Sequence, residues 1–426
     1  MDLKAVEKLA GSLNKEILDL GTVDPEYTVT RAAWRNRDKV IVFRVKGREW
    51  ITGYSNLVTR RQDIYRLFNV RNDEELYRLM EKALNNPIHL EKDDFEKYFK
   101  RIDGLLDTLP FIKYYREDGG YYLTSSVFIA CYETYCNSSF HRVMYHSNEK
   151  ATVRIVPRHL HYIVGRRHEE GNDAPVALVL GLNPFQELAA AMNPPFGVFE
   201  VGVGATLGGG SKVVETPLFK IPVPADSSII VEGFITRDRD REGPFTDILM
   251  LVDQERREPI FKPLAVYVSR EESPVFHAIV PGSWEHQFLM GFPREPIIYS
   301  AVKRSVPGVK SVRLTEGGSG WLHAVISIKQ SSPGEARLAG LAAVSAHPSI
   351  KHVFVVDEDI DVDDPLMIEW AMATRMKGSG DIIVLRDVKG STLDPRSSEG
   401  VGDKVIFIAV KPWGEPWDKY RRVGVP

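Results

Sequence analysis

The sequence predicts an α+β protein built in three parts. Its length of 426 residues corresponds to roughly 2.8 domains of ordinary size. Helical and strand-like patterns alternate in residues 1–105 and again in residues 301–426, as in α/β domains. Residues 106–300 instead carry many short β-rich runs between turn residues. That texture is typical of an antiparallel sheet closed or half-closed as a barrel.

The N-terminal part combines amphipathic helices with a buried strand. Apolar side chains recur every three or four positions in residues 1–20, and charges are spread throughout, so this segment predicts a helix rather than a signal peptide. Residues 40–45, VIVFRV, predict a strand, and residues 74–86 predict an amphipathic helix. Pro87 and the charged stretch after it indicate a domain boundary.

The central and C-terminal parts differ in how their strands are connected. In the central part we expect strands at YYLTSSVFIACYETY, RVMYHSN, ATVRIVP, APVALVLGL, SIIVEGFI, ILMLVDQ, PLAVYVSR and VFHAIVPG, with one helix near residues 185–193. In the C-terminal part, helices at ARLAGLAAVSA and DPLMIEWAMATR alternate with strands at SVRLTEG, HAVISIKQ, HVFVVDED, DIIVLRD and KVIFIAV. The acidic run VVDEDIDVDDP lacks the glycine and terminal glutamate of a calcium loop, and we interpret it as a strand end followed by a helix cap.

Composition excludes several classes of partner. The chain has 55 Lys and Arg against 58 Asp and Glu, which argues against nucleic-acid binding but leaves room for a small basic pocket. No apolar run approaches the roughly 20 residues that a membrane span needs. Cys131 and Cys136 are too few for a disulfide scaffold or a four-thiolate zinc site. We interpret them as buried or incidental thiols in a reducing cytosol, which predicts a cytoplasmic protein.

The segment EGPFTD places two carboxylates, Glu242 and Asp247, on one tight loop, because Gly243 and Pro244 interrupt any regular helix. Like charges at short range raise one pKa, and such an acid can deliver a proton near neutral pH. The alternative is a solvated acidic turn. The segment NSSFHR offers the Arg142 guanidinium, suited to a carboxylate.

Other polar groups suit a cation or a phosphate. Asn137 offers an amide oxygen for a divalent cation, although a turn asparagine is the simpler interpretation. In VPRHLHYIVGRRH, His159 and His161 would share a face on a strand, one as a metal ligand, with the arginines forming a phosphate pocket. The alternative is an exposed basic turn.

Glycines in FEVGVGATLGGG allow close backbone approach by a phosphate-bearing ligand. This segment matches neither the dinucleotide-binding fingerprint that opens a helix nor a Walker loop. The alternative is a glycine-rich hairpin, in which Glu200 is the one acid.

Taken together and in this order, the segments resemble the UbiD-like decarboxylases, which use prenylated flavin mononucleotide. The resemblance covers about residues 106–415. It rests on N-x4-R in NSSFHR, R-x-L-x-H in RHLHY, the glutamate of FEVGVGATLGG, VPADSSIIVEG with EGPFTD, VVDEDID with WAMATR, and LDP at 393–395. It implies an N-terminal α/β domain, a central split β-barrel flavin-binding domain and a C-terminal α/β domain.

The resemblance also implies roles for single residues. Asn137, His159 and Glu200 fall on the positions that hold Mn²⁺ or Mg²⁺ against the flavin phosphate, with K⁺ commonly beside it. Cofactor contacts fall on Ser139, Phe140, His141, Arg142, Arg158, His159 and Leu160. The catalytic trio falls on Arg142, Glu242 and Asp247. In that trio the arginine holds the substrate carboxylate, Glu242 orients the arginine, the flavin is the electron sink, and Asp247 protonates the carbon.

Three positions depart from the family pattern. His141 replaces a common tyrosine, which bears on the substrate pocket, whereas Ser228 and Ile408 replace common acids and bear on packing or assembly.

The chain's compactness resembles archaeal members of the family. One archaeal branch converts trans-anhydromevalonate 5-phosphate to isopentenyl phosphate in a modified mevalonate pathway of isoprenoid biosynthesis, and we expect this reaction. Arg166, Arg167 and His168 are candidates to meet the substrate phosphate. The alternatives are decarboxylation of an aromatic acid such as a 4-hydroxybenzoate derivative, or a non-catalytic flavin-binding scaffold. The family further implies a flavin prenyltransferase as cofactor supplier and a homo-oligomer, dimeric or larger.

Overall fold

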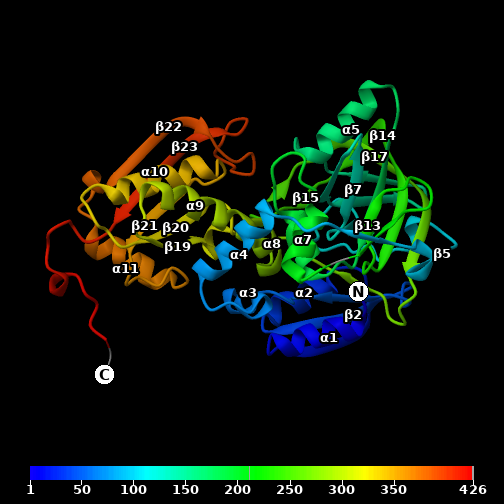
Figure 1. The fold of residues 1–426 in the computed structure, drawn as a ribbon, viewed down its shortest axis with the longest axis horizontal. Helices are drawn as coiled ribbons and strands as arrows, with labels where there is room; N and C mark the ends of the chain where they lie inside the picture. Colours follow the sequence, from blue (N-terminus) through cyan, green and yellow to red (C-terminus); the bar gives the residue numbers. More distant parts are fainter. Residues whose placement is uncertain (211, 425–426) are drawn as a thin grey trace. The chain divides into compact units, whose positions relative to one another are not determined.

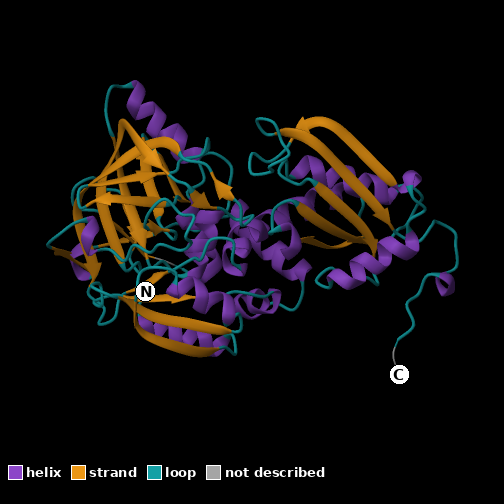
Figure 2. Cartoon of the chain, turned by 180° about the vertical axis from the view of Figure 1, so that it is seen from behind, coloured by secondary structure: helices purple, strands orange, loops and turns teal. Residues whose placement is uncertain are grey.

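The structure, a computed structural model, describes residues 1–210 and 212–424, which form two compact units. The first unit comprises Met1–Val70 and Lys82–Leu289, and the second comprises Arg71–Glu81 and the chain from Met290 onward. Figure 1 follows the chain by colour and Figure 2 separates helices from strands. No helix in the described ranges is both long and apolar enough to cross a bilayer. The division into three domains at 105 and 300 stays a prediction.

The first unit contains a four-stranded sheet with helices on both faces. Its strands, in spatial order, are β1 (Glu16–Val23), β2 (Lys39–Val45), β3 (Thr52–Ser55) and β18 (Val275–His277). The helices are α1 (Leu3–Ser12), α2 (Thr28–Arg35) and α3 (Arg61–Phe68). Alternate residues of β2 face opposite ways: Val40 and Val42 pack with α1, and Ile41 and Phe43 pack with α2.

The N-terminal helix is shorter than predicted. It ends at Ser12, and Ile17 already lies in β1. Asn14 has a φ of 57°, in the left-handed region that asparagine tolerates better than most residues, and this turn separates helix from strand. The three-and-four spacing of apolar residues therefore extends beyond the end of the helix, and Ile17, which fits this spacing, belongs to a strand.

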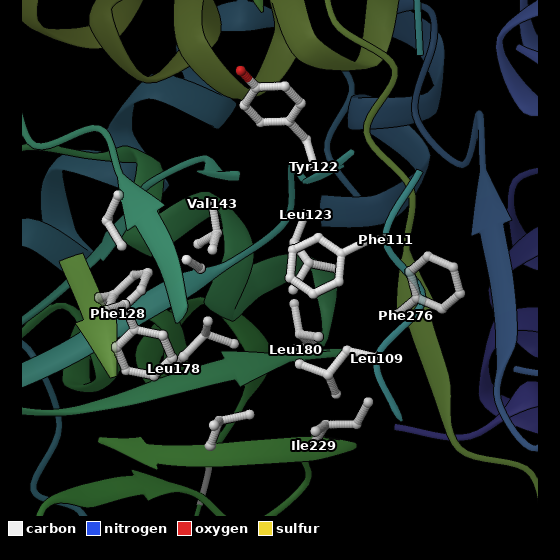
Figure 3. Close-up of a cluster of buried hydrophobic side chains, with 14 of the residues drawn as sticks. Leu109, Phe111, Tyr122, Leu123, Phe128, Val143, Leu178, Leu180, Ile229 and Phe276 are labelled. Atoms are coloured by element: carbon white, nitrogen blue, oxygen red, sulfur yellow. The ribbon is translucent and has the colours of Figure 1, made fainter. Parts of the chain in front are cut away.

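The second and larger sheet of this unit is antiparallel throughout. Its strands are β5 (Phe99–Ile102), β6 (Tyr122–Leu123), β7 (Val127–Tyr132), β8 (Tyr135–Phe140), β9 (Val143–Ser147), β10 (Lys150–Val153), β11 (Ala174–Leu180), β14 (Ile229–Glu242) and β17 (Arg256–Ser269). The hydrogen-bonded order is an open series, β6-β9-β10-β17-β14-β11-β7-β8, with β5 also on β17. Its inner face packs the apolar cluster in Figure 3, which includes Phe128, Leu178 and Ile229. The predicted central antiparallel sheet is confirmed.

The prediction of free thiols is wrong, because the structure joins Cys131 and Cys136 in a disulfide. Tyr132 and Tyr135 pair on either side of a two-residue loop, so β7 and β8 form a tight hairpin. The two cysteines are then directly opposite, with their Cα atoms 4.1 Å apart. The long β-rich run in the sequence concealed this turn.

Helices α5 (His159–Glu169), α6 (Pro184–Ala191) and α7 (Glu200–Gly208) lie against this sheet. Helix α8 (Trp284–Gly291) instead packs its Trp284 ring on Trp34 of α2. The strand considered for His159 and His161 is therefore a helix, and so is the glycine-rich segment for which a hairpin was the alternative interpretation. A Cβ on Gly204 would lie 2.6 Å from Gln186 Oε1. The glycines of α7 thus allow it to pack closely on α6, and this tertiary packing overrides their poor helix propensity.

Shorter elements complete the first unit. They are β4 (Glu91–Asp93), β12 (Lys212–Glu215), β13 (Pro222–Pro224), β15 (Phe245–Thr246), β16 (Val252–Asp253) and the end of α4 (Asp73–Asn85). Short 3-10 turns occur in the two units at Phe95–Lys97, Leu106–Thr108, Phe292–Arg294, Glu316–Gly318, Ser379–Asp381 and Trp417–Lys419. The predicted helix over residues 74–86 is confirmed, whereas only two residues of ILMLVDQ form a strand.

The second unit is a five-stranded α/β layer, as predicted. Its strands are β19 (Val309–Leu314), β20 (His323–Ile328), β21 (His352–Asp357), β22 (Ile382–Lys389) and β23 (Val401–Ala409), and its main helices are α9 (Glu295–Ser305), α10 (Glu335–Ala346) and α11 (Pro365–Arg375). Gly340 of α10 packs on Ile406, and Ala371 of α11 packs with Ala409 on the other face of β23. The acidic run behaves as predicted: β21 ends at Asp357, and Asp364 caps α11.

Replacing Arg313 with Met is expected to destabilise the second unit. Arg313 is 6% exposed and contacts Asp73 at 3.0 Å, Glu295 at 3.3 Å and Asp363 at 2.9 Å. Loss of the guanidinium leaves the buried carboxylates of Asp73 and Glu295 without this cation, so the free energy of unfolding in urea should fall by about 3–5 kcal/mol.

The matched control is Arg337→Gln. The Arg337 side chain is 47% exposed and lies 4.0 Å from Asp381. Its loss should cost less than about 1 kcal/mol. Equal losses in the two variants would contradict the role assigned to the buried cluster.

Candidate active site

Arg142 and Glu242 form a buried ion pair between two strand ends. Arg142 follows β8, and Glu242 is the last residue of β14. Nε and Nη2 of Arg142 donate to the two oxygens of Glu242, each at 2.8 Å. Burial opposes the charge of Arg142, but the hydrogen bond and charge of Glu242 raise its pKa above the ordinary value. The guanidinium is thus held in one plane by a bidentate contact.

A second carboxylate, Asp253 of β16, also holds Arg142. Nη2 donates to Asp253 Oδ2 at 2.8 Å, and Arg256 donates to the other oxygen of Asp253. The Phe245 ring lies under the guanidinium, 4.3 Å from Cζ to the ring centroid. No contact found among the described residues uses Nη1. This edge of Arg142 is therefore available to an anion.

Asp247 lies on the loop that joins β15 to β16. Its Oδ1 accepts hydrogen bonds from the backbone N–H groups of Leu249 at 2.8 Å and Leu251 at 3.1 Å. Burial raises the pKa of Asp247, and the charge of Asp253 raises it further, against the two amide contacts and Arg142. With Oδ1 held by amides, Oδ2 is the oxygen placed to carry a proton.

A row of polar side chains follows one face of β8. Asn137 Nδ2 donates to Glu200 Oε1 at 2.7 Å, and Ser139 Oγ lies 2.9 Å from both Asn137 Oδ1 and His141 Nε2. His141 Nδ1 lies 3.0 Å from the carbonyl oxygen of Arg154. Alternate strand residues share a face, so the hairpin aligns these groups in register.

The three predicted metal ligands are brought together. Glu200 is the first residue of α7, and His159 is the first residue of α5. His159 Nδ1 lies 3.7 Å from Glu200 Oε1, the same oxygen that contacts Asn137. In the described chain no three His, Cys, Asp or Glu residues cluster as metal ligands, so the set depends on the asparagine amide. One imidazole nitrogen with amide and carboxylate oxygens fits Mn²⁺ or Mg²⁺.

Two further features fit a ligand at this place. The Tyr135 side chain is buried, and its hydroxyl has no hydrogen-bond partner among the described residues. Burial raises the pKa of Tyr135, and so does the nearby charge of Glu200. Arg158 precedes α5, is exposed, and forms no ion pair found in the described ranges. A helix start beside an unpaired guanidinium suits a phosphate, as a flavin mononucleotide would present.

Several predicted residues do not join this group. Arg166 and Arg167 lie in the last turn of α5, where they pair with Glu169 and Glu170, and His168 lies 3.1 Å from the Ile235 carbonyl. That turn is roughly 10 Å along the helix from His159. The structure therefore does not bring the proposed phosphate cations to Arg142. The side chain of Leu160 is likewise part of the buried core.

The departures Ser228 and Ile408 have packing roles. Ser228 is buried and accepts a hydrogen bond from the Val275 backbone at 3.2 Å, while its hydroxyl donates to the Met1 carbonyl at 2.5 Å. Ile408 is buried in β23.

The sequence did not reveal Asp253, Tyr135 or His286 as site residues. His286 of α8 accepts from the Gly282 N–H at 3.0 Å. Burial lowers its pKa to about 4, and the charge of Arg142 contributes. Asp253 lies near the end of the apolar run ILMLVDQ, which predicts a strand and gives no sign of a site residue. Its position six residues after Asp247 is the one signal that could have found it.

Comparison with known proteins gives matches over most of the chain. Residues 90–284 match the 3-octaprenyl-4-hydroxybenzoate carboxy-lyase Rift-related domain, and residues 287–409 match the corresponding C-terminal domain. The anhydromevalonate phosphate decarboxylase of Aeropyrum pernix is 42% identical, over 84% of this chain and 81% of that protein. The protein of the same name from Methanothermobacter thermautotrophicus is 38% identical over 91% of each chain.

Solved structures agree on the fold. The UbiD-class enzyme HmfF from Pelotomaculum thermopropionicum, solved in complex with FMN, superposes with a TM-score of 0.94 and 30% identity, covering 100% of this chain and 98% of its own. An evolved dimeric form of the same enzyme, in complex with prFMN, gives a TM-score of 0.90 at 28% identity, covering 100% and 97%. The predicted fold class is confirmed.

Substituting Asp253 with Asn is expected to lower the pKa of Asp247, because it removes a negative charge that favours the protonated acid. Infrared titration measures this pKa from the carboxylic acid band that Asp247→Asn abolishes.

Glu255→Gln is the matched control. It removes a carboxylate two residues away whose side chain is 53% exposed, and it should leave the band unchanged. A band that titrates identically in Asp253→Asn and in the unaltered chain would refute the electrostatic role of Asp253.

Proposed function

The chain belongs to the UbiD family of carboxy-lyases, and from this premise we propose that it converts trans-anhydromevalonate 5-phosphate to isopentenyl phosphate and CO₂ with prenylated FMN. The observation that carries the chemistry is the arginine held by two carboxylates with one edge open, beside an acid whose pKa is raised by burial. The names of the archaeal relatives, at 42% and 38% identity, support this substrate.

In this proposal Arg142 binds the carboxylate of the substrate through Nη1. Glu242 and Asp253 occupy Nε and Nη2, so the guanidinium cannot rotate away from its position. Prenylated FMN, when bound, supplies an electron sink for the electrons that remain as CO₂ leaves. The role of Arg142 is then orientation, which converts binding energy into a fixed reacting geometry.

Asp247 delivers the proton that replaces CO₂ on the carbon. Its Oδ1 is held by two amide groups, and Oδ2 carries the proton. Because burial raises the pKa of Asp247, a larger fraction of it remains protonated toward neutral pH than for an ordinary aspartate. After transfer the carboxylate is stabilised by the same two amides, and a proton from solvent restores the acid.

Asn137, His159 and Glu200 would hold Mn²⁺ or Mg²⁺, with K⁺ nearby, and the divalent ion would bind the flavin phosphate. Ser139, Phe140, His141 and Arg158 would complete the cofactor contacts. The relatives solved with FMN and with prFMN support a flavin at this site.

The cellular setting belongs to the same proposal. We expect a cytoplasmic homo-oligomer that receives its cofactor from a flavin prenyltransferase, and the dimeric form of HmfF supports self-association. The aromatic-acid alternative is supported by phenolic acid decarboxylases, among them one of Escherichia coli O157:H7 at 30% identity over 73% of this chain and one of Bacillus subtilis at 28% identity over 72%. Because these identities are lower than those of the archaeal relatives, we use aromatic acids as the comparison substrates.

The substrate is tested by measuring CO₂ released from trans-anhydromevalonate 5-phosphate and from hydroxylated benzoic and cinnamic acids. The enzyme is produced together with a flavin prenyltransferase. We expect kcat/KM for the phosphorylated acid to exceed that for every aromatic acid by at least about 100-fold, or about 2.7 kcal/mol. Faster turnover of an aromatic acid would favour the alternative.

Asp247→Asn is expected to reduce turnover by about 10²–10⁴-fold while the flavin stays bound, because the amide cannot supply the proton. In the unaltered enzyme, kcat should fall as pH rises through the raised pKa of Asp247, since the acid form is the active one. Absorption spectra report flavin content and stopped assays report turnover. Undiminished turnover in the variant would remove Asp247 from this role.

A further inference from the structure

We propose that His141 is a positioning residue that acts through Ser139 to turn the oxygen of the Asn137 amide toward Glu200, where the two oxygens bind a divalent cation together. This inference rests on the cation site of the proposed function and adds a role that depends on a residue departing from the family pattern.

The argument begins with the hydrogen on His141. The carbonyl of Arg154 can only accept a hydrogen bond, and it lies 3.0 Å from His141 Nδ1. Nδ1 therefore carries the hydrogen. Burial lowers the pKa of His141 to about 4, so the ring is neutral and Nε2 presents a lone pair.

The Ser139 hydroxyl can donate its hydrogen to only one of two neighbouring acceptors. Its Oγ lies 2.9 Å from His141 Nε2 and 2.9 Å from the Asn137 amide, but it has one hydrogen to give. If that hydrogen goes to Asn137, Oγ and Nε2 face each other with lone pairs only. If it goes to Nε2, Ser139 can only accept from Asn137, so the NH₂ group of Asn137 must face Ser139.

The second arrangement creates the cation site. Turning the amide over exchanges the positions of its oxygen and nitrogen with little other movement. The Asn137 oxygen then faces Glu200 Oε1 across the 2.7 Å contact that the NH₂ group otherwise makes. Two acceptors at that separation repel unless a cation binds both. His159 Nδ1, 3.7 Å from the same Glu200 oxygen, adds a nitrogen ligand.

The network is therefore in conflict without a cation and consistent with one. Without it, either the Ser139–His141 contact or the Asn137–Glu200 contact lacks a hydrogen. With it, the Ser139–His141 contact has its hydrogen, and the oxygens of Asn137 and Glu200 share the cation. His141 accepts the Ser139 hydrogen at Nε2. This contact makes the cation-binding orientation of the Asn137 amide the favoured one.

The test is a Mn²⁺ titration of the full chain without flavin, with free Mn²⁺ followed by electron paramagnetic resonance. The variants are His141→Phe, Ser139→Ala and the double variant. The His141 ring already packs on the Phe128 ring, with their centroids 6.0 Å apart, so a phenylalanine ring suits this position. Each single variant should weaken Mn²⁺ binding about tenfold, and the double variant should also weaken it about tenfold, since both break one relay.

His146→Phe is the matched control. His146 Nε2 also contacts a hydroxyl, that of Thr152 at 3.0 Å, but this pair has no connection to Asn137. Its Mn²⁺ affinity should equal that of the unaltered chain. Should His141→Phe fail to fold, as judged by thermal melting, Ser139→Ala carries the test, because it removes a single oxygen.

Unchanged Mn²⁺ affinity in His141→Phe or Ser139→Ala overturns the relay, as does a hundredfold loss in the double variant. If the unaltered chain binds no Mn²⁺, the cation site and the relay both fail. The reaction is judged separately, by CO₂ release from the flavin-loaded enzyme, so failure of the relay and failure of the proposed function are distinguishable.

Discussion

The buried contact between Arg142 and Glu242 is the constraint on which the site depends. A guanidinium removed from water must have its carboxylate partners, and leaving either charge unpaired would cost several kcal/mol. The contact therefore fixes the end of β8 against the end of β14. Asp253 extends it to β16, so the loop that carries Asp247 is closed at both ends. The carboxylate contacts that Arg142 requires therefore also fix the position of Asp247.

A second constraint organises the other end of the same strand. The polar row on β8 continues from His141 through Ser139 to Asn137, and it ends on Glu200, where helix α7 begins. Asn137 and Ser139 lie on β8, and His141 and Arg142 directly follow its end, so one short segment carries both the groups suited to a cation and the arginine suited to a carboxylate. The spacing between the two is thus set by a few residues of backbone rather than by side-chain flexibility.

The sequence predicted what depends on local pattern and missed what depends on tertiary contact. The antiparallel sheet and the cap of α11 follow from periodicity and turn chemistry. The prediction that Glu242 and Asp247 share one tight loop is wrong, because Glu242 ends β14 and Asp247 follows the short strand β15. Helix α7 could not be predicted, because its glycines are stable in a helix only where Gln186 of α6 packs against Gly204. The pairing of Cys131 with Cys136 depends on hairpin register, and the role of Asp253 on a partner 111 residues away.

Burial raises the pKa of Asp247, and charge balance around Arg142 limits the opposing effect of that arginine. A lone cation there would lower the pKa of the acid. Here Arg142 and Arg256 are matched by Glu242 and Asp253, so the four groups have no net formal charge. A bound substrate carboxylate would make the cluster negative and would strengthen the hold of Asp247 on its proton. In the proposed reaction, loss of CO₂ would remove this negative charge from Arg142 and leave the electrons to the flavin sink, so Asp247 would hold its proton less tightly at the step that requires the proton.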